Sequence, residues 1–284
     1  MPIIHAIVLG IVQGFSEFLP ISSSGHLLLV PWLFGWDDFS GPNGESLKKS
    51  FDVALHLGTF FAVLGYFRHD VKVYVVEGTK LIFTRTKPTN TDGRLAWLFV
   101  LATVPAAAVG ALFEDKIDTV LGTPFIIALS LIGFGLLLGW ADRKTGRRKL
   151  EDFHAPDALK VGVAQALALN PGTSRSGITM TAARWVGFDR DAAVRISFIM
   201  SLPVIFGAVV FKMLSMVSDG GYEDLLIPIA VGIVTSFIAG LIAVWGTIKL
   251  VSTHSLMPFV IYRVTVGVLM LIILALGWRD NIAV

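Results

Sequence analysis

Long runs of apolar residues, separated by short polar connections, dominate this sequence. A helix that crosses a bilayer needs roughly 17–25 consecutive apolar residues. Six stretches meet or approach that length: 51–67, 95–113, 120–140, 192–217, 225–248 and 258–278. The first is the weakest of them, because it is short and carries Asp52 and His56. The pattern predicts an all-α polytopic membrane protein with six transmembrane helices.

Two further apolar regions, 2–36 and 158–181, are interrupted near the middle by proline, glycine and serine. Pro20 and Pro171 lack an amide hydrogen, and each disfavours helix in the residue before it. Each region therefore predicts a helix, a break and a second helix. The alternative is that prolines and glycines merely kink two ordinary spans, which gives eight crossings.

Basic residues gather in two connections, 68–94 and 142–160, each with six lysines or arginines. Because cytoplasmic loops carry an excess of these residues, both connections are expected inside. The connections at 114–115 and 219–224 are short and mostly acidic, so they are expected outside. These assignments alternate correctly along the chain.

This alternation determines how the two broken regions lie. The span after 2–36 runs inward, so 2–36 must return to the outside, whereas 158–181 must return to the inside. Both are predicted to be re-entrant helix–break–helix hairpins, one from each face. The halves 1–140 and 158–284 then each hold one hairpin and three spans, an odd number of crossings that inverts the second half. We expect a single membrane domain, 1–284, built as an inverted-topology repeat.

Composition supports a membrane protein. Hydrophobic residues make up 54% of the 284 residues and charged residues only 15%, with a mean hydropathy of +0.74. A soluble domain carries about a quarter charged residues. The net charge of +2 argues against a nucleic-acid partner, and the absence of cysteine excludes disulfide and thiol chemistry. The start of the chain lacks a basic segment, so no cleaved signal peptide is expected.

The two breaks carry matching polar segments, Gln13–His26 and Gln165–Thr179. Aligned, they pair Gly10 with Gly162, Gln13 with Gln165, Ser22 with Ser174, Ser24 with Ser176 and Gly25 with Gly177. Polar and ionisable groups are costly inside a bilayer and commonly mark function. The match predicts one site built from two halves.

The second segment combines small residues, hydroxyls and an arginine. Amides at the start of the following helix would point at an anion there, and the helix dipole would favour it. Arg175 supplies a planar fork that fits phosphate oxygens, and Ser174, Ser176 and Thr179 supply hydroxyl donors. These features predict a phosphate-binding site. The alternative is a structural turn in which Arg175 pairs with a carboxylate such as Glu17.

The first segment offers a carboxylate, hydroxyls and an imidazole. Gln13 and Glu17 share one helix face and could hold Mg²⁺ or Ca²⁺ against phosphate oxygens. His26 can move protons near neutral pH. Ser23 is a candidate nucleophile if His26 or Glu17 activates it. The run Ser22–Ser24 could equally form a helix N-cap.

Two other groups of charged residues are weaker candidates. Asp52 and His56 are four residues apart and could form a polar face near the site. The charged residues within 184–195 are expected to form an interfacial loop.

Three motifs carry a family resemblance: Gln13-x-x-x-Glu17, the run Phe18-Leu-Pro-Ile-Ser-Ser-Ser-Gly-His26, and Pro171-Gly-Thr-Ser-Arg-Ser-Gly-Ile-Thr179. They resemble the signatures of bacterial undecaprenyl pyrophosphate phosphatases of the bacitracin-resistance integral membrane type. The family's first motif is Glu or Gln, three residues, then Glu, and its second is Pro-Gly-x-Ser-Arg-Ser-x-x-Thr. The likeness covers nearly the whole chain, and the two motifs together are highly specific.

The resemblance implies hydrolysis of undecaprenyl diphosphate to undecaprenyl phosphate and phosphate, which recycles the lipid carrier for peptidoglycan synthesis and confers bacitracin resistance. It also implies a divalent cation, paired re-entrant regions and a bacterial inner-membrane protein whose site opens to the periplasmic side. By motif position, the functional residues would be Glu17, Ser23, His26, Ser174, Arg175 and Thr179, with Ser22 and Ser176 as further contacts to the diphosphate.

Several alternatives remain open from sequence. The attacking group could be Ser23 or a water molecule. A flippase for a polyprenyl phosphate is the competing function, since inverted repeats with broken helices are also a transporter plan. The expected partners are a polyprenyl diphosphate and membrane lipid, and a homodimer is left open.

Overall fold

The structure, a computed structural model, describes residues 1–39, 44–84, 91–219 and 225–281. Within these ranges the chain forms eleven α-helices and no β-strand. The helices are α1 (Ile3–Phe18), α2 (Ser23–Phe34), α3 (Gly44–Tyr66), α4 (Arg68–Thr84), α5 (Thr91–Leu121), α6 (Pro124–Asp142), α7 (Ala155–Ala166), α8 (Arg175–Trp185), α9 (Arg190–Asp219), α10 (Leu226–Val251) and α11 (Met257–Ala275). Two short 3-10 helices lie at Leu150–Asp152 and Leu167–Leu169.

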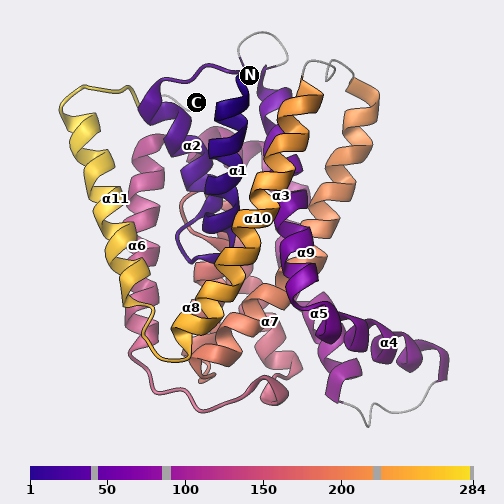
Figure 1. Cartoon of the computed structure of the whole chain (residues 1–284). Coiled ribbons are helices and arrows are strands. Elements are labelled where there is room, and N and C mark those ends of the chain that lie inside the picture. The colour runs from indigo at the N-terminus through magenta and orange to yellow at the C-terminus, as the bar shows by residue number, and fades with distance from the viewer. Residues whose placement is uncertain (40–43, 85–90, 220–224, 282–284) are drawn as a thin grey trace.

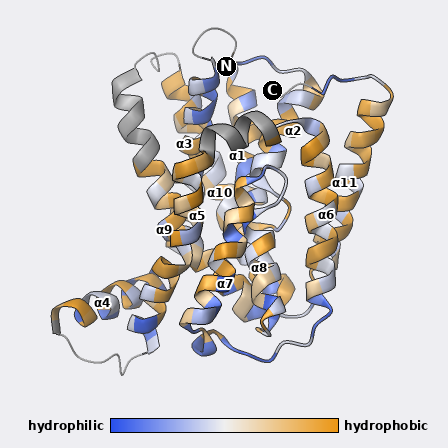
Figure 2. Cartoon of the chain, turned by 180° about the vertical axis from the view of Figure 1, so that it is seen from behind, coloured by the Kyte–Doolittle hydropathy of each residue, from blue (hydrophilic) through white to orange (hydrophobic). Residues whose placement is uncertain are grey.

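Five described helices are long and apolar enough to cross a membrane. The segments are Thr91–Phe113, Pro124–Asp142, Arg190–Val210, Leu226–Val251 and Met257–Ala275. Helices α3 and α4 pass the same test as a pair bent by 85°. Hydrophobic residues colour most of the long helices, whereas hydrophilic residues gather at the ends of the bundle (Figure 2). The predicted all-helical, multi-pass membrane protein is confirmed.

Two predicted connections have a different structure. Part of the basic stretch 68–94 forms α4, which leaves α3 at a sharp bend and runs across the direction of the long helices (Figure 1). Helix α5 continues through the acidic pair at 114–115, where a loop was predicted, and ends at Leu121. The chain turns at Gly122 instead, because Pro124 begins the next helix with its fixed φ. The predicted connection at 219–224 lies outside the described residues except for Asp219.

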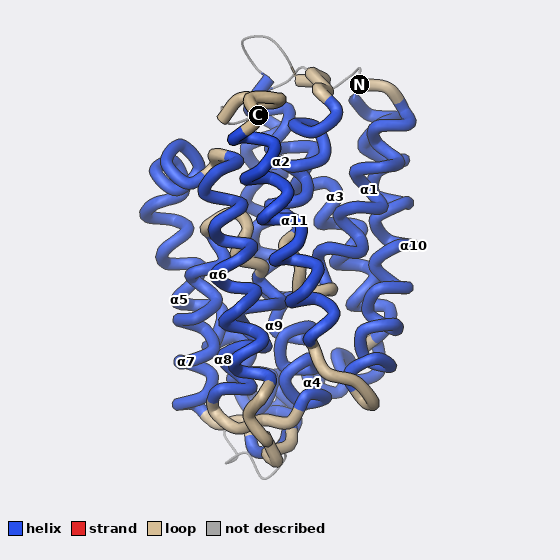
Figure 3. The backbone as a smooth tube through the Cα atoms, turned by 90° about the vertical axis from the view of Figure 1, so that its left-hand side faces the viewer, coloured by secondary structure: helices blue, strands red, loops and turns tan. Residues whose placement is uncertain are grey.

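The two broken regions form helix pairs that enter the bundle from opposite ends. Helices α1 and α2 extend toward the end that holds both termini, and α7 and α8 extend toward the other end (Figures 1 and 3). Helix α1 packs against α10, and α7 packs against α5. Each hairpin thus packs against a helix of the other half of the chain, as an inverted repeat requires. The division into repeats at 1–140 and 158–284 stays a prediction.

Small residues bring α1 against α10. A Cβ atom added to Gly14 would lie 2.5 Å from Ala239 Cβ and 2.6 Å from Ser236 O, and one added to Gly10 would lie 2.8 Å from Gly232 O. Close backbone approach of this kind is the usual way helices associate in membranes. The contact fixes the helix that carries the polar side chains of the first hairpin.

The charged residues predicted to form a loop within 184–195 lie mostly in helices, because Arg184 belongs to α8 and α9 already begins at Arg190. They are tied to the bundle. Arg190 Nε donates to Asp142 Oδ1 at 2.7 Å, and Leu256 N donates to Asp142 Oδ2 at 3.0 Å. Arg184 is buried and donates to the carbonyls of Asp142 and Phe188. These bonds join α6, α8, α9 and α11 at the end from which the second hairpin enters.

Single cysteines test the predicted sidedness, since the chain has no native cysteine. With Ser46→Cys, we expect a membrane-impermeant thiol reagent to label intact cells. With Thr145→Cys, we expect labelling only after the membrane is opened, because the basic connection beside it is expected inside. Ser201→Cys, at a buried position, serves as the unlabelled control. Labelling of position 145 in intact cells would overturn the topology.

Candidate active site

Helices α2 and α8 begin in the same unusual way. Ser22 and Ser174 precede them with φ angles of 81° and 73°, and are the described non-glycine residues with positive φ. The side-chain oxygen of each serine accepts a hydrogen bond from a glycine amide, Gly25 at 3.3 Å and Gly177 at 3.1 Å. Such backbone angles cost on the order of 1–3 kcal/mol for an L-residue. The hydroxyls of Ser22 and Ser174 therefore act here as helix caps.

The loops before these helices meet in the middle of the bundle (Figure 1). Ser176 Oγ donates to Leu19 O across the two hairpins at 3.2 Å. A Cβ atom at Gly25 would lie 3.3 Å from Gly172 Cα, so the first turn of α2 packs closely against the second loop. The first amides of a helix have no partner within it, and the dipole adds positive charge. Two such helix N-termini side by side favour an anion.

The side chain of Arg263, on α11, joins both loops. It is fully buried, and its guanidinium donates to five backbone carbonyls among the described residues. The acceptors lie in the first loop, the second loop and α6: Pro20 (3.2 Å), Gly172 (2.9 Å), Thr173 (2.9 Å), Leu131 (3.2 Å) and Ser130 (3.4 Å). A Cβ atom at Gly177 would lie 2.8 Å from its Nη1, so a side chain there would displace the guanidinium. One cation thus satisfies three loop carbonyls that the broken helices leave free, and it also contacts two carbonyls of α6.

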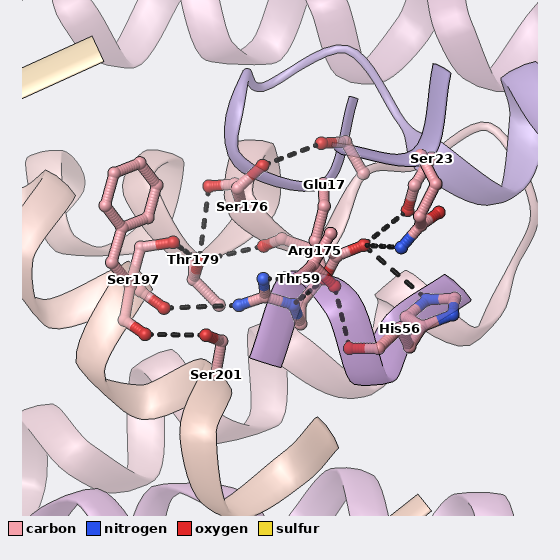
Figure 4. A network of polar contacts seen from close by, with 12 residues as sticks. Glu17, Ser23, His56, Thr59, Arg175, Ser176, Thr179, Ser197 and Ser201 are labelled. Atoms are coloured by element: carbon pink, nitrogen blue, oxygen red, sulfur yellow. Dashed lines mark hydrogen bonds and ion pairs between the residues drawn. The ribbon is translucent and has the colours of Figure 1, made fainter. Parts of the chain in front are cut away.

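Glu17, Arg175 and Ser23 form a connected group at the meeting point (Figure 4). Arg175 donates to Glu17 Oε1 from Nη2 at 2.9 Å and from Nε at 3.3 Å. Ser23 Oγ donates to Glu17 Oε2 at 2.7 Å. The side chain of Glu17 is 4% exposed and that of Arg175 is 13% exposed. Arg175 thus forms an ion pair with one oxygen of Glu17, as the alternative from sequence predicted, and the Ser23 hydroxyl bonds to the other oxygen.

Thr179 lies behind Arg175 rather than beside the loops. Its hydroxyl is within hydrogen-bond distance of Arg175 O and Ser197 Oγ, both at 2.8 Å, and Thr179 is fully buried. Arg175 Nη1 donates to Ser197 O at 3.2 Å. Thr179 and Ser197 therefore hold the first turn of α8 and the guanidinium in place (Figure 4).

Gln13 and Glu17 are adjacent, as their spacing predicts. Gln13 Nε2 donates to Glu17 Oε2 at 3.1 Å, whereas the buried Gln13 Oε1 has no hydrogen-bond partner. Among the described residues, no group of three or more His, Cys, Asp or Glu side chains could hold a metal ion. The donor set suits a cation that takes its remaining ligands from substrate phosphates and water, as Mg²⁺ commonly does.

The ring nitrogens of His26 bond to groups other than Ser23 and Glu17. Its Nδ1 is 2.7 Å from Ser22 O, and its Nε2 is 2.8 Å from the hydroxyl of Tyr262 on α11. A carbonyl can only accept, so Nδ1 carries the hydrogen, and in the neutral ring Nε2 accepts from the tyrosine. Both nitrogens are occupied at the start of α2.

A different histidine faces the carboxylate. His56 Nε2 lies 3.6 Å from Glu17 Oε2, and its Nδ1 donates to Asp52 O at 2.7 Å (Figure 4). Of the polar face of α3 considered from the spacing of Asp52 and His56, the structure places His56 at the site. The side chain of His56 is 29% exposed.

Sequence reasoning missed Tyr262 and Arg263. Both lie in the predicted span 258–278, in which Arg263 is the sole charged residue. An ionisable residue inside a span is a functional hypothesis by default. That rule would have selected Arg263, but its five carbonyl partners could not be read from the motifs.

These features define an integral membrane protein with a polar centre, between two helix N-termini, suited to a phosphate-bearing ligand. Sequence comparison places the chain more specifically. It belongs to the family described as bacitracin resistance protein BacA, which matches residues 6–269. The family indicated by the motifs is thereby confirmed.

Curated relatives share nearly their whole length with this chain. A protein of Desulforudis audaxviator is 46% identical over 270 residues, covering 95% of this chain and 97% of the relative. One of Geobacter metallireducens is 44% identical over 266 residues, covering 93% and 95%. One of Moorella thermoacetica is 41% identical over 279 residues, covering 98% and 99%. Each of these relatives is named undecaprenyl-diphosphatase.

Replacing Arg263 tests its hold on the two loops. Arg263→Met leaves the loop carbonyls of Pro20, Gly172 and Thr173 without their donor, so we expect a loss of at least about 3 kcal/mol in unfolding free energy. The measurement is denaturant unfolding in detergent. Arg195→Met is the matched control, because Arg195 forms an exposed pair with Asp191 and should change stability by less than about 1 kcal/mol. Equal stability of the two variants would contradict the assignment.

Proposed function

We propose that this protein hydrolyses undecaprenyl diphosphate to undecaprenyl phosphate and inorganic phosphate. This reaction recycles the lipid carrier for peptidoglycan synthesis, and it confers bacitracin resistance. The observation that carries the proposal is the group Arg175, Glu17 and Ser23 between two helix N-termini. Membership of the family and the names of the relatives support the same substrate.

Without substrate, Arg175 is neutralised by Glu17 at 2.9 Å. An incoming diphosphate carries more negative charge than a carboxylate and offers paired oxygens to the guanidinium fork. It therefore competes with Glu17 for Arg175, while the first amides of α2 and α8 bind further phosphate oxygens. Phosphoryl transfer depends mainly on positioning and charge stabilisation, which these groups supply.

The hydrogen bond between Ser23 and Glu17 orients the attacking group. In the serine route, Ser23 Oγ attacks the terminal phosphorus and Glu17 takes its proton. The bond from phosphorus to the bridging oxygen breaks, and undecaprenyl phosphate leaves with the electron pair. Water then hydrolyses the phosphoserine. In the water route, Glu17 activates a water molecule directly, and Ser23 positions it.

The two histidines take different parts in this proposal. His56 faces the Glu17 oxygen that receives the proton and is placed to pass it on. His26 holds the first turn of α2 through Ser22 and Tyr262, and so positions Ser23. Its part is therefore indirect, although it belongs to the family motif.

A divalent cation, Mg²⁺ or Ca²⁺, would be held by Glu17 and the unpartnered Gln13 Oε1. Bound there, it would neutralise charge on the phosphate oxygens. Ser174, Ser176 and Thr179 support the proposal by shaping the backbone that faces the diphosphate.

We further propose that the protein lies in the bacterial inner membrane and that its site opens to the periplasmic side. Helices α1 and α2 extend away from the end that holds the basic connection 142–160 (Figure 1). Ser24, at the start of α2, is exposed, and Tyr262 is 41% exposed. The polyprenyl tail would lie in lipid between the spans. The names of the relatives favour hydrolysis over transport of the lipid.

Phosphate release from undecaprenyl diphosphate in detergent tests the activity, because detergent removes any readout of transport. We expect release by the wild type and a fall of at least about 10³-fold in Arg175→Ala, the range for an arginine on a transferring phosphoryl group. Arg195→Ala should remain near wild type, since Arg195 pairs on the surface with Asp191. Near-normal turnover by Arg175→Ala would refute the proposed binding of phosphate.

Trapping separates the two routes of attack. After rapid acid quenching with substrate labelled in the terminal phosphate, the serine route predicts label on Ser23 and loss of turnover in Ser23→Ala. Ser24→Ala is the control, because Ser24 is adjacent and contacts Ser22 rather than Glu17. Substantial turnover by Ser23→Ala would establish water as the attacking group.

A further inference from the structure

An apolar groove lies on the outer surface of the bundle, between α3 and α10. It is an open, shallow depression of about 480 Å³, and its lining includes Phe61, Leu64, Ile233 and Phe237. Arg68, the first residue of α4, also lines it. None of these side chains takes part in the polar contacts of Glu17, Ser23 or Arg175, so the groove is separate from the candidate active site.

Arg68 is a cation without a carboxylate partner. Its Nη1 donates to Gly65 O at 3.3 Å, and it is exposed. In the described part of the chain, neither Arg68 nor Lys72 forms an ion pair with an acidic side chain. Residues four apart share a helix face, whereas Asp70 between them points to the opposite side. The bend after α3 therefore presents two positive groups on one face.

The bend also sets the depth of these charges in the membrane. Helix α4 turns by 85° from α3 and projects sideways from the bundle, near the end that holds the second hairpin (Figure 1). Its exposed residues mix Lys72 and Lys80 with Val75, Val76 and Phe83. Such a helix suits the interface between headgroups and acyl chains. At that depth Arg68 would reach the headgroups, and the apolar groove would face the acyl chains.

From this arrangement we propose that the groove binds an anionic phospholipid, with one acyl chain between α3 and α10 and the phosphate on Arg68. The occupant is a phospholipid rather than the polyprenyl diphosphate. The substrate would enter at the end of the bundle that holds α1 and α2. The charged end of the groove, at Arg68, lies toward the opposite end (Figure 1). The surroundings of Arg68 also differ from those of Arg175, which lies between two helix N-termini and beside the carboxylate of Glu17.

Gly65 provides a way to fill the groove without disturbing the helices. No heavy atom lies within 4 Å of an added Cβ atom at Gly65, so a leucine there points into open space. Gly133 on α6 is open in the same way, and α6 packs against α11 and α8 rather than against the helices that line the groove. The pair Gly65→Leu and Gly133→Leu adds the same surface and differs only in place.

The test uses purified full-length protein in detergent, with phosphatidylglycerol or phosphatidylcholine of identical acyl chains. Native mass spectrometry counts bound lipid, and thermal unfolding measures the stabilisation that binding produces. We expect one preferentially retained phosphatidylglycerol in the wild type and in Gly133→Leu. In Arg68→Gln and in Gly65→Leu, we expect its affinity to fall at least about fivefold, the loss for one charge-assisted hydrogen bond or a blocked chain site.

Equal retention of phosphatidylcholine would overturn the proposed role of charge. Unchanged affinity in Arg68→Gln and Gly65→Leu would overturn the site. Displacement of phosphatidylglycerol by undecaprenyl diphosphate would assign the groove to the substrate instead. Phosphate release by Arg68→Gln and by Gly65→Leu should equal that of the wild type. Because lipid retention is measured without turnover, its result does not depend on whether the proposed hydrolysis is correct.

Discussion

Helices that end inside a bilayer leave backbone carbonyls that water cannot reach. In this chain the buried guanidinium of Arg263 donates hydrogen bonds to such carbonyls in both loops. Unsatisfied backbone groups are costly in hydrocarbon. The guanidinium reaches a carbonyl of the first loop, two of the second loop and two of α6. Since the same loops carry the starts of α2 and α8, the positions of Ser23 and Arg175 depend on this one buried cation.

The same arrangement creates an electrostatic problem that Glu17 resolves. Two helix N-termini and Arg175 concentrate positive charge at a place that is poor in water. Glu17 supplies the opposing charge, and its two oxygens bond to Arg175 and Ser23. A buried ion pair of this kind is weak evidence for stability. It is better understood as a polar centre kept ready for an anion.

Hydrophobic pattern and motif spacing predicted much of this structure. The apolar stretches located the long helices, because a membrane demands nearly continuous apolar segments. The breaks at Pro20 and Pro171 located the loops, and the motifs located Glu17 and Arg175. Long-range contacts were beyond this reasoning: local pattern does not show that His26 bonds to Tyr262, or that His56 faces Glu17. The acidic pair at 114–115 was also a poor guide to the end of α5. The helix continues to Leu121, and the turn at Gly122 and Pro124 ends it.

The pairing of Glu17 with Arg175 has a consequence for turnover. A carboxylate attached to the protein is always present at the cation, so any ligand must outcompete it. A diphosphate presents two charged groups to the site, whereas each product of its cleavage presents one. Glu17 would return to Arg175 more readily against a single phosphate than against the intact substrate. The resting ion pair would thereby limit product inhibition, and it would set a minimum charge for inhibitors aimed at this site.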